Sequence, residues 1–554
     1  MSLKLSYRYI TTIACITFMM IAIFITPPAI AATDAKSSLV TVAWLEKNLG
    51  NKDIVLLDAS PASRYAAKHI PGALNVDVFS FGGREAPAAE MEKRFQSWGI
   101  SRAKRIVIYD QGGTYFATSL FFDLYYHGFP PDKLVVLDGG LSKWQAGNGV
   151  VTKDATPAPR PGNFRVVKVK EDVRARLPEF MAASGDPKNN AIVEALDMDY
   201  HFGSTKFFDR AGHVPHAISA PNPDFYNADK TFKSPEEIQR MLTYLGVKPD
   251  QQVYSHCGGG IAASVPFFAA KMMLNYPKVK LYKESQLEWL RDDRTLPFWT
   301  YDAPNLQREK TWLASWGHPM MRQFGVAKLS VVDVRTPEAY KLGHVPYAVN
   351  IPAEIFKQNM STPAKLAEYL GAAGVDPNYE AVIVSEGGVN ANSALAFLML
   401  EKMGQKKISV LTEGVDDWAL GGLQLVKEAT TIGKAKSPQD MAVPATTYPV
   451  DVRAGIVTAD APRADALYPK IYISSGRNVS AKIQDGKILH VPYTDLVNAE
   501  GAPKPAKEIW NILVKAGLPR YAEIICFADE PGDAAANYFI LKLMGYPDVK
   551  VLAG

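Results

Sequence analysis

The sequence predicts an α/β protein made of several small domains, each with a central parallel sheet. The chain has 554 residues, whereas a single hydrophobic core seldom grows beyond ~300 residues. Short apolar segments typical of buried strands alternate with segments of helical periodicity, and one such series recurs along the chain. The recurring unit of ~110 to 140 residues has the size of a domain, which favours tandem domains over a solenoid.

Each unit opens with an apolar strand that ends in an acidic residue. These strands are expected at 54–58, 192–194 and 331–335. A His-x-Pro turn follows each strand and begins at His69, His213 or His344. The second unit carries an insertion around 202–210. Because the histidines recur in units without cysteine, we interpret them as turn-forming residues.

The second half of each unit contains a buried strand, a glycine-rich turn and a helical segment. The strands are expected at 105–111, 253–257 and 381–386, and the turns at 112–114, 258–260 and 387–389. A last strand and a tryptophan follow in each unit: Trp144, Trp289 and Trp418. The residues at the apex of the turns are Gln111, Cys257 and Glu386, so the second unit alone has a thiol there.

These patterns divide the chain into four domains with two joints. The domains are expected at 37–155, 165–303, 310–428 and 445–554, separated by a Pro-rich joint at 155–162 and a joint of low hydrophobicity at 429–448. The fourth unit is degenerate. Its strands are expected at 470–473, 523–527 and 549–552 and its turn at His490, and it lacks the tryptophan-bearing helix.

The N-terminal residues 1–31 have the pattern of an export signal. Two basic residues precede an apolar run at 10–25, and an Ala-x-Ala site ends at Ala31. We expect an exported, periplasmic protein. An uncleaved membrane anchor is the alternative, and a lipoprotein attached at Cys15 fits less well. No later segment is long and apolar enough to span a membrane. The formal net charge of +4, with scattered basic residues, argues against nucleic-acid binding.

Two cysteines, Cys257 and Cys526, remain after the expected cleavage. So few cysteines in a large exported chain do not indicate a disulfide framework. Cys257 precedes three glycines and a helical segment, where backbone amides and the helix dipole favour a thiolate. Glycines at these positions let the amides turn toward the sulfur. Cys526 lies inside a strand and is expected in the core, and His256 points away from the thiol.

The ordered set of motifs resembles the rhodanese family of sulfurtransferases. The acid-ended strand, the His-[IV]-Pro turn, the Cys-Gly-x-Gly loop and the Asp-Gly-Gly pattern with its tryptophan match in order over nearly the whole mature chain. The resemblance implies four tandem doubly wound domains with one active cysteine, and Asp110 resembles the acid of inactive copies. It also implies a persulfide on Cys257, cradled by the amides of Gly258, Gly259, Gly260, Ile261, Ala262 and Ala263.

The expected activity is transfer of sulfane sulfur from a small donor to a thiophilic acceptor such as cyanide or a thiol, without metal or cofactor. The donor, of thiosulfate or 3-mercaptopyruvate type, stays open. Mercaptopyruvate-type relatives use an arginine before the His turn to bind the donor. Arg210 stands at this position, and its two alternative roles are a substrate ligand and a surface residue. The position near the first strand reads Glu194 and has no arginine. A protein acceptor or redox partner also stays open. The alternative is a non-enzymatic scaffold, sulfur carrier or redox sensor.

Overall fold

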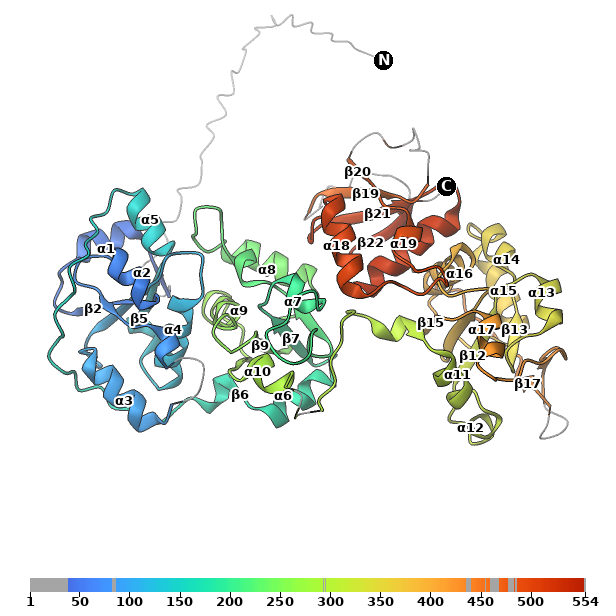
Figure 1. Cartoon of the computed structure of the whole chain (residues 1–554), viewed down its shortest axis with the longest axis horizontal. Coiled ribbons are helices and arrows are strands. Elements are labelled where there is room, and N and C mark those ends of the chain that lie inside the picture. Colours follow the sequence, from blue (N-terminus) through green and yellow to red (C-terminus); the bar gives the residue numbers. More distant parts are fainter. Residues whose placement is uncertain are drawn as a thin grey trace, which may run out of the picture.

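The computed structural model contains four five-stranded parallel sheets of identical strand order (Figure 1). It describes residues 38–81, 86–291, 293, 295–434, 440–453, 455–458, 468–476, 483 and 486–552, so the expected export signal and Cys15 lie outside the described residues. In the first unit the strand order is β1-β5-β4-β2-β3, and each later sheet repeats it. The predicted fold class of tandem parallel α/β units is confirmed.

The first unit contains β1 (Leu39–Val40), α1 (Val42–Asn48), β2 (Ile54–Asp58), α2 (Ala62–Ala67), β3 (Leu74–Asn75), α3 (Ala88–Ser97), β4 (Arg105–Tyr109), α4 (Phe116–Tyr126), β5 (Leu134–Leu137) and α5 (Gly140–Ala146). The second contains β6 (Arg174–Ala175), α6 (Leu177–Ser184), β7 (Asn190–Glu194), α7 (Met198–His201), β8 (Ala217–Ser219), α8 (Pro235–Tyr244), β9 (Gln252–His256), α9 (Ser264–Phe268), β10 (Val279–Tyr282) and α10 (Ser285–Trp289). Helices cover both faces of each sheet, so the central strands are almost wholly buried.

The third unit contains β11 (Gln307–Arg308), α11 (Lys310–Trp316), α12 (Pro319–Gln323), β12 (Leu329–Asp333), α13 (Pro337–Leu342), β13 (Ala348–Asn350), α14 (Ala353–Gln358), α15 (Pro363–Ala372), β14 (Glu380–Val384), α16 (Ala391–Lys402), β15 (Lys407–Leu411) and α17 (Val415–Leu420). Its edge strand β11 begins before the expected domain start at 310, because a two-residue strand leaves no periodicity to read. A short parallel pair, β16 (Thr431–Ile432) and β17 (Ala442–Val443), lies in the following joint.

The fourth unit contains β18 (Val457–Thr458), β19 (Lys470–Ser474), β20 (Lys487–His490), α18 (Ala506–Ala516), β21 (Glu523–Phe527), α19 (Pro531–Leu543) and β22 (Val549–Leu552). The expected turn at His490 is wrong. His490 ends β20 and pairs with Ser474, at the register position that Asn75 and Asn350 hold in other units. The degenerate unit nevertheless keeps the complete sheet.

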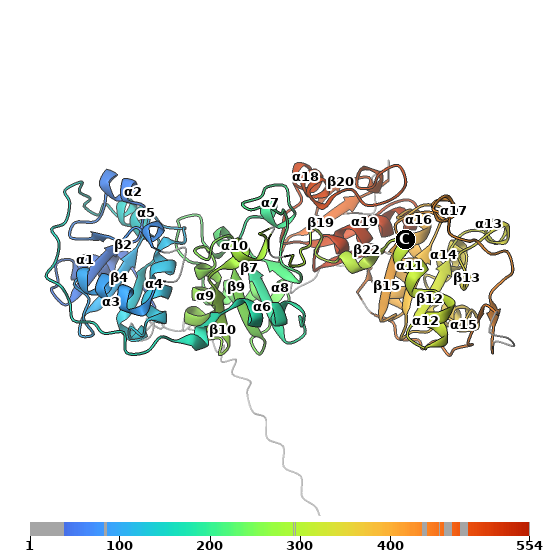
Figure 2. The ribbon, with the colours of Figure 1, turned by 60° about the horizontal axis from the view of Figure 1, so that its bottom comes forward.

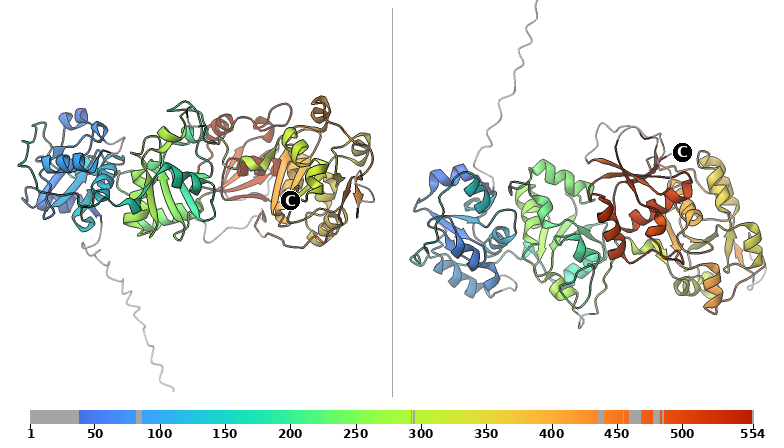
Figure 3. Two further views of the ribbon diagram at one scale, coloured as in Figure 1. Left: turned by 90° about the horizontal axis from the view of Figure 1, so that it is seen from below. Right: turned by 45° about the horizontal axis from the view of Figure 1, so that its top comes forward.

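The four units lie in a row, in the spatial order one, two, four, three (Figures 1 and 2). The views of Figure 3 show the same order. Units pair through the apolar helix that follows each glycine turn. In the first pair α4 packs on α9, with Phe122 and Phe267 edge to face at 5.0 Å. In the second pair α16 packs on α19, with Phe397 and Phe539 in the same arrangement at 5.0 Å. The two halves of the molecule therefore share one mode of pairing.

A buried ion pair also joins the first two units. The Lys283 ammonium lies 2.8 Å from the carboxylate of Asp123 on α4, and both side chains are almost inaccessible to solvent. Lys283 stands where the first unit has the Asp-Gly pattern after its last strand. The departure of the second unit from that pattern thus supplies a contact between units.

Candidate active site

Cys257 follows β9 directly, at the carboxyl edge of the second sheet, where ligands of parallel α/β folds usually bind. Register pairing identifies its counterparts. Glu194 pairs with His256, Asp58 with Tyr109, Asp333 with Val384 and Ser474 with Phe527. The next residues, Asp110, Ser385 and Ala528, are therefore the structural equivalents of Cys257. The expected apices Gln111 and Glu386 are each displaced by one residue.

Cys257 is held by three hydrogen bonds, one to its sulfur and two to its backbone. Its side chain is buried, and the residue is 2% exposed. The sulfur accepts a hydrogen bond from the amide of Gly260 at 3.1 Å. The Cys257 amide donates to Ser285 Oγ at 3.1 Å, and the Cys257 carbonyl accepts from the Gln286 amide at 3.0 Å. The loop is therefore anchored on both sides to the start of α10.

Gly260 is the one loop position that only glycine fits. Its φ is +81°, and a Cβ there would lie 1.9 Å from the carbonyl oxygen of Lys283. A residue with a side chain would push the loop away from β10. The glycine thus brings its own amide to the sulfur.

The first unit shows that this type of loop holds an anion. The Asp110 carboxylate accepts hydrogen bonds from the amides of Gly112 and Ala117, at 2.7 and 3.0 Å, and from the Thr114 hydroxyl at 2.6 Å. In the second unit the sulfur stands at the equivalent position. Helix α9 begins only at Ser264, after the glycine turn, and Gly260 is the amide that reaches the sulfur. Ligand roles for Gly258, Gly259, Ile261, Ala262 and Ala263 stay predictions.

Two aromatic residues that the sequence did not reveal lie at this loop. Phe207, in the insertion of the second unit, places its ring 3.2 Å from where a Cβ on Gly258 would stand. The ring stacks on Tyr200 at 4.1 Å and remains 55% exposed. Tyr115 enters from the first unit. Burial, and then the nearby Cys257, raise the pKa of the Tyr115 hydroxyl. The site therefore draws on both units of the pair.

Arg210 serves the framework of the second unit. Its guanidinium donates to the backbone carbonyls of Trp289, Leu290, Arg291 and Leu296. These contacts tie the insertion to the segment after α10. A role for Arg210 as a substrate ligand stays a prediction.

The remaining residues near the two cysteines are structural. His256 is fully buried behind the sheet, and burial lowers the pKa of its imidazole. Cys526 lies inside β21 with no solvent exposure, and burial raises the pKa of its thiol far above the usual value. The core position expected for Cys526 is confirmed. Both cysteines are free.

Comparison with known proteins agrees with this architecture. The family model described as "Rhodanese-like domain" matches residues 41–147 and 317–420, which fall in the first and third units. The other two units have the same strand order. The first and third units are rhodanese-like domains.

Related proteins cover about half of this chain. The probable 3-mercaptopyruvate sulfurtransferase of Pseudomonas aeruginosa is 28% identical over 281 residues, which are 47% of this chain and 97% of that protein. The sulfur carrier protein TtuD of Thermus thermophilus is 28% identical over 272 residues, which are 45% and 93% of the two chains. Among solved structures, SseA of Escherichia coli matches with a TM-score of 0.41 and 23% identity, over 45% of this chain and 99% of that one.

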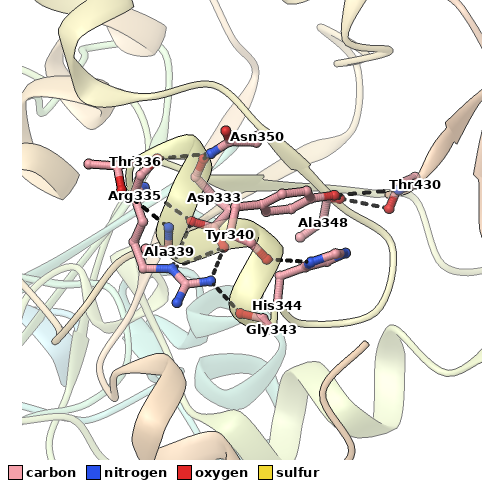
Figure 4. A network of polar contacts seen from close by, with 10 residues as sticks. All are labelled: Asp333, Arg335, Thr336, Ala339, Tyr340, Gly343, His344, Ala348, Asn350 and Thr430. Atoms are coloured by element: carbon pink, nitrogen blue, oxygen red, sulfur yellow. Dashed lines mark hydrogen bonds and ion pairs between the residues drawn. The ribbon is translucent and has the colours of Figure 1, made fainter. Parts of the chain in front are cut away.

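The first and third rhodanese-like units share a stack of tyrosine on the turn histidine. Tyr65 lies on His69, and Tyr340 on His344, each with ring centroids 3.7 Å apart. Figure 4 shows the third unit, where Arg335 pairs with Asp333 at 2.7 Å and also donates to the Gly343 carbonyl. These contacts hold the turn together and confirm the turn-forming interpretation of the two histidines.

The second unit replaces the tyrosine by histidine. His201, at the end of α7, stacks on His213 at 3.7 Å. Its Nδ1 donates to Glu194 at 2.5 Å and its Nε2 to Asp302 at 2.6 Å. Burial opposes a charge on His201, but the two carboxylates outweigh burial and raise the pKa of this imidazole to about 9. Burial and the charge of His201 lower the pKa of His213 to about 4.

The same cluster has the residue types of a metal site. Three possible ligand atoms lie within 4.8 Å of one another, one each from His201, His213 and Asp302. A metal lies in the plane of each imidazole that binds it, whereas these two rings are parallel to within 3°. The arrangement is that of an ion pair with a stacked neutral histidine. The sequence did not reveal it, because Asp302 is 101 residues from His201.

Proposed function

We propose that this chain is a sulfurtransferase that carries sulfane sulfur as a persulfide on Cys257. The observation that supports the proposal is the Cys257 sulfur, which accepts the Gly260 amide in a loop whose equivalent in the first unit binds a carboxylate. A loop that stabilises an anion favours the thiolate, which is the nucleophilic form of cysteine. The other three units have Asp, Ser and Ala at this position.

The proposed reaction has two steps. With thiosulfate, the Cys257 thiolate attacks the outer sulfur, the S–S bond of the donor breaks, and sulfite leaves with the bonding electron pair. Cyanide then attacks the outer sulfur of the persulfide, thiocyanate forms, and the Cys257 thiolate is restored. With 3-mercaptopyruvate the C–S bond of the donor breaks instead, and the enolate that leaves takes up the proton of the donor thiol to give pyruvate. The Gly260 amide stabilises the anionic sulfur before and after each transfer.

The test uses the full chain and two cysteine variants. Purified protein is incubated with thiosulfate or 3-mercaptopyruvate plus cyanide, and thiocyanate is measured. We expect turnover that Cys257→Ser abolishes and Cys526→Ser preserves, together with a mass increase of one sulfur on Cys257. Turnover that survives Cys257→Ser contradicts the proposed nucleophile. A persulfide that no acceptor removes favours a sulfur carrier over an enzyme.

We also propose that the protein is exported to the periplasm. The basic and apolar pattern of residues 1–31 supports this location. Within the described residues, no helix has the length and apolar character required to cross a bilayer. Cell fractionation with N-terminal sequencing tests the proposal: we expect mature protein that starts at Ala32 in the periplasmic fraction. An intact N-terminus in the membrane fraction supports the anchor instead.

A further inference from the structure

The second unit has a buried charge network where the first and third units have a neutral tyrosine stack. In the first and third units, the tyrosine on the turn histidine donates its hydroxyl to a backbone carbonyl, of Ala73 or Ala348. In the second unit, His201 occupies that place between two carboxylates. A buried imidazolium is costly unless it is paired. The unit that carries the cysteine thus maintains a charged histidine where the first and third units have a neutral tyrosine.

One end of the network reaches the cysteine loop. Glu194 accepts a hydrogen bond from the side-chain amide of Gln286, and both residues are buried. The backbone amide of Gln286 donates to the carbonyl of Cys257. The neighbouring Ser285 accepts the Cys257 amide and has a φ of +53°, which is unusual for a residue with a side chain. The geometry of the loop therefore depends on where Glu194 holds Gln286.

The other end of the network reaches the fourth unit. Asp302 follows the last strand of the second unit, and Gly545 of the fourth unit packs directly on its carboxylate. The adjacent Ala303 amide donates to the Leu543 carbonyl at 3.1 Å. Burial raises the pKa of Asp302, but His201, then His213 and then the Arg520 guanidinium of the fourth unit together bring this pKa below its usual value.

The helix that carries His201 is fixed by the same neighbour. Trp510 of α18 donates its indole N–H to the Asp199 carboxylate at 3.0 Å. The Trp510 ring also lies 5.4 Å from that of Phe202, which follows His201. Both His201 and its partner Asp302 thus take their positions from contacts with the fourth unit.

We propose that the chain Asp302–His201–Glu194–Gln286 couples the docking of the fourth unit to the geometry of the Cys257 loop, so that this cysteine-free unit controls sulfur transfer in the second. His201, Gln286 and Asp302 are positioning residues in this scheme, and none touches the reacting sulfur with its side chain. The coupling rests on the proposed function of Cys257. In this scheme the degenerate fourth unit has a regulatory role, although it has no cysteine in its own loop.

The sharpest test perturbs the network from the fourth unit. A Cβ at Gly545 would lie 1.8 Å from an Asp302 carboxylate oxygen, so Gly545→Ala displaces Asp302 while the sequence of the second unit stays unchanged. Gly517→Ala is the matched control. Gly517 lies in the same unit with a similar φ, +79° against +75°, and a Cβ there meets only the tip of Lys487. The two variants share the backbone strain and differ in the contact with Asp302.

Two rates are measured on the full chain: persulfide formation from the active donor, and alkylation of Cys257 by iodoacetamide. We expect Gly545→Ala to lower both by about 10- to 100-fold relative to Gly517→Ala, because a misplaced reacting group of this kind costs up to about 100-fold in rate. Asp302→Asn, which keeps the side-chain shape, should lower both rates and shift their pH profile. Circular dichroism confirms that each variant is folded.

The outcomes separate this proposal from the proposed function. Equal alkylation rates in folded Gly545→Ala, Asp302→Asn and control proteins overturn the coupling, whatever the turnover. If the wild-type protein shows no turnover but Gly545→Ala still slows alkylation of Cys257, the sulfurtransferase function is overturned and the coupling stands. If Gly545→Ala does not fold, Asp302→Asn decides on the same two rates.

Discussion

Replacing Gly260 by alanine should remove the hydrogen bond that stabilises the Cys257 thiolate. A new Cβ would stand 1.9 Å from the Lys283 carbonyl oxygen, whereas real Cβ contacts essentially never fall below 3.0 Å. The two atoms must therefore separate by 1.1 Å or more, the difference of these distances. A φ of +81° adds about 1 kcal/mol of strain for a residue with a side chain. The Gly260 amide moves with the strained backbone.

The expected loss follows from that single contact. A hydrogen bond to a charged group contributes about 1.5 to 3 kcal/mol. Its removal should slow sulfur transfer and alkylation of Cys257 by about 10- to 150-fold, at 1.36 kcal/mol per factor of ten. Gly259→Ala is the control in the same loop, because a Cβ at Gly259 meets nothing within 4 Å. If Gly260→Ala and Gly259→Ala react at the same rate, the amide does not stabilise the sulfur and the reasoning fails.

Three further predictions concern the pH dependence, the unit interface and the mouth of the site. Because the pKa of His201 is raised to about 9, charged His201 stabilises the folded state fully below about pH 6.5, and this stabilisation is lost as the pH rises through 9. The melting temperature should therefore fall over this pH range, and His201→Gln should make the fall smaller. For His213, whose pKa is lowered to about 4, stabilisation is lost as the pH falls toward 4. Lys283→Met should destabilise the paired first and second units by about 3 kcal/mol in urea unfolding, because it leaves Asp123 buried and unpaired; Lys283→Met with Asp123→Leu should regain most of that loss. Phe207→Ala should speed the reaction of Cys257 with bulky thiol reagents more than with iodoacetamide, and equal acceleration of both would show that the ring does not cover the loop.

Local pattern was sufficient to predict the central strands and to single out Cys257. The strands at 54–58 and 381–386 were recognisable because buried parallel strands are continuous apolar runs. The position of Cys257 followed from its glycines. The equivalent positions in other units were displaced by one residue, because only strand register, and not the appearance of the turn, identifies Asp110 and Ser385.

Contacts between distant segments could not be predicted. Tyr115 reaches the site from another unit, and Asp302 reaches His201 across 101 residues. His490 was misplaced because a histidine followed by proline resembles the turn of the other units, although here it ends a strand. Nothing in a linear pattern indicates that the fourth unit would lie between the second and the third.

That spatial order has a consequence for how the molecule assembles. The unit that lies between the second and the third follows both of them in the sequence, so it is synthesised after them (Figure 1). Until it folds, the apolar face of α16 and the α7 surface with Phe202 have no partner, and both are prone to aggregation. Folding of the fourth unit then joins the paired first and second units to the third in one step. A nascent or truncated chain should accordingly behave as two loosely tethered bodies with an incomplete support behind Cys257.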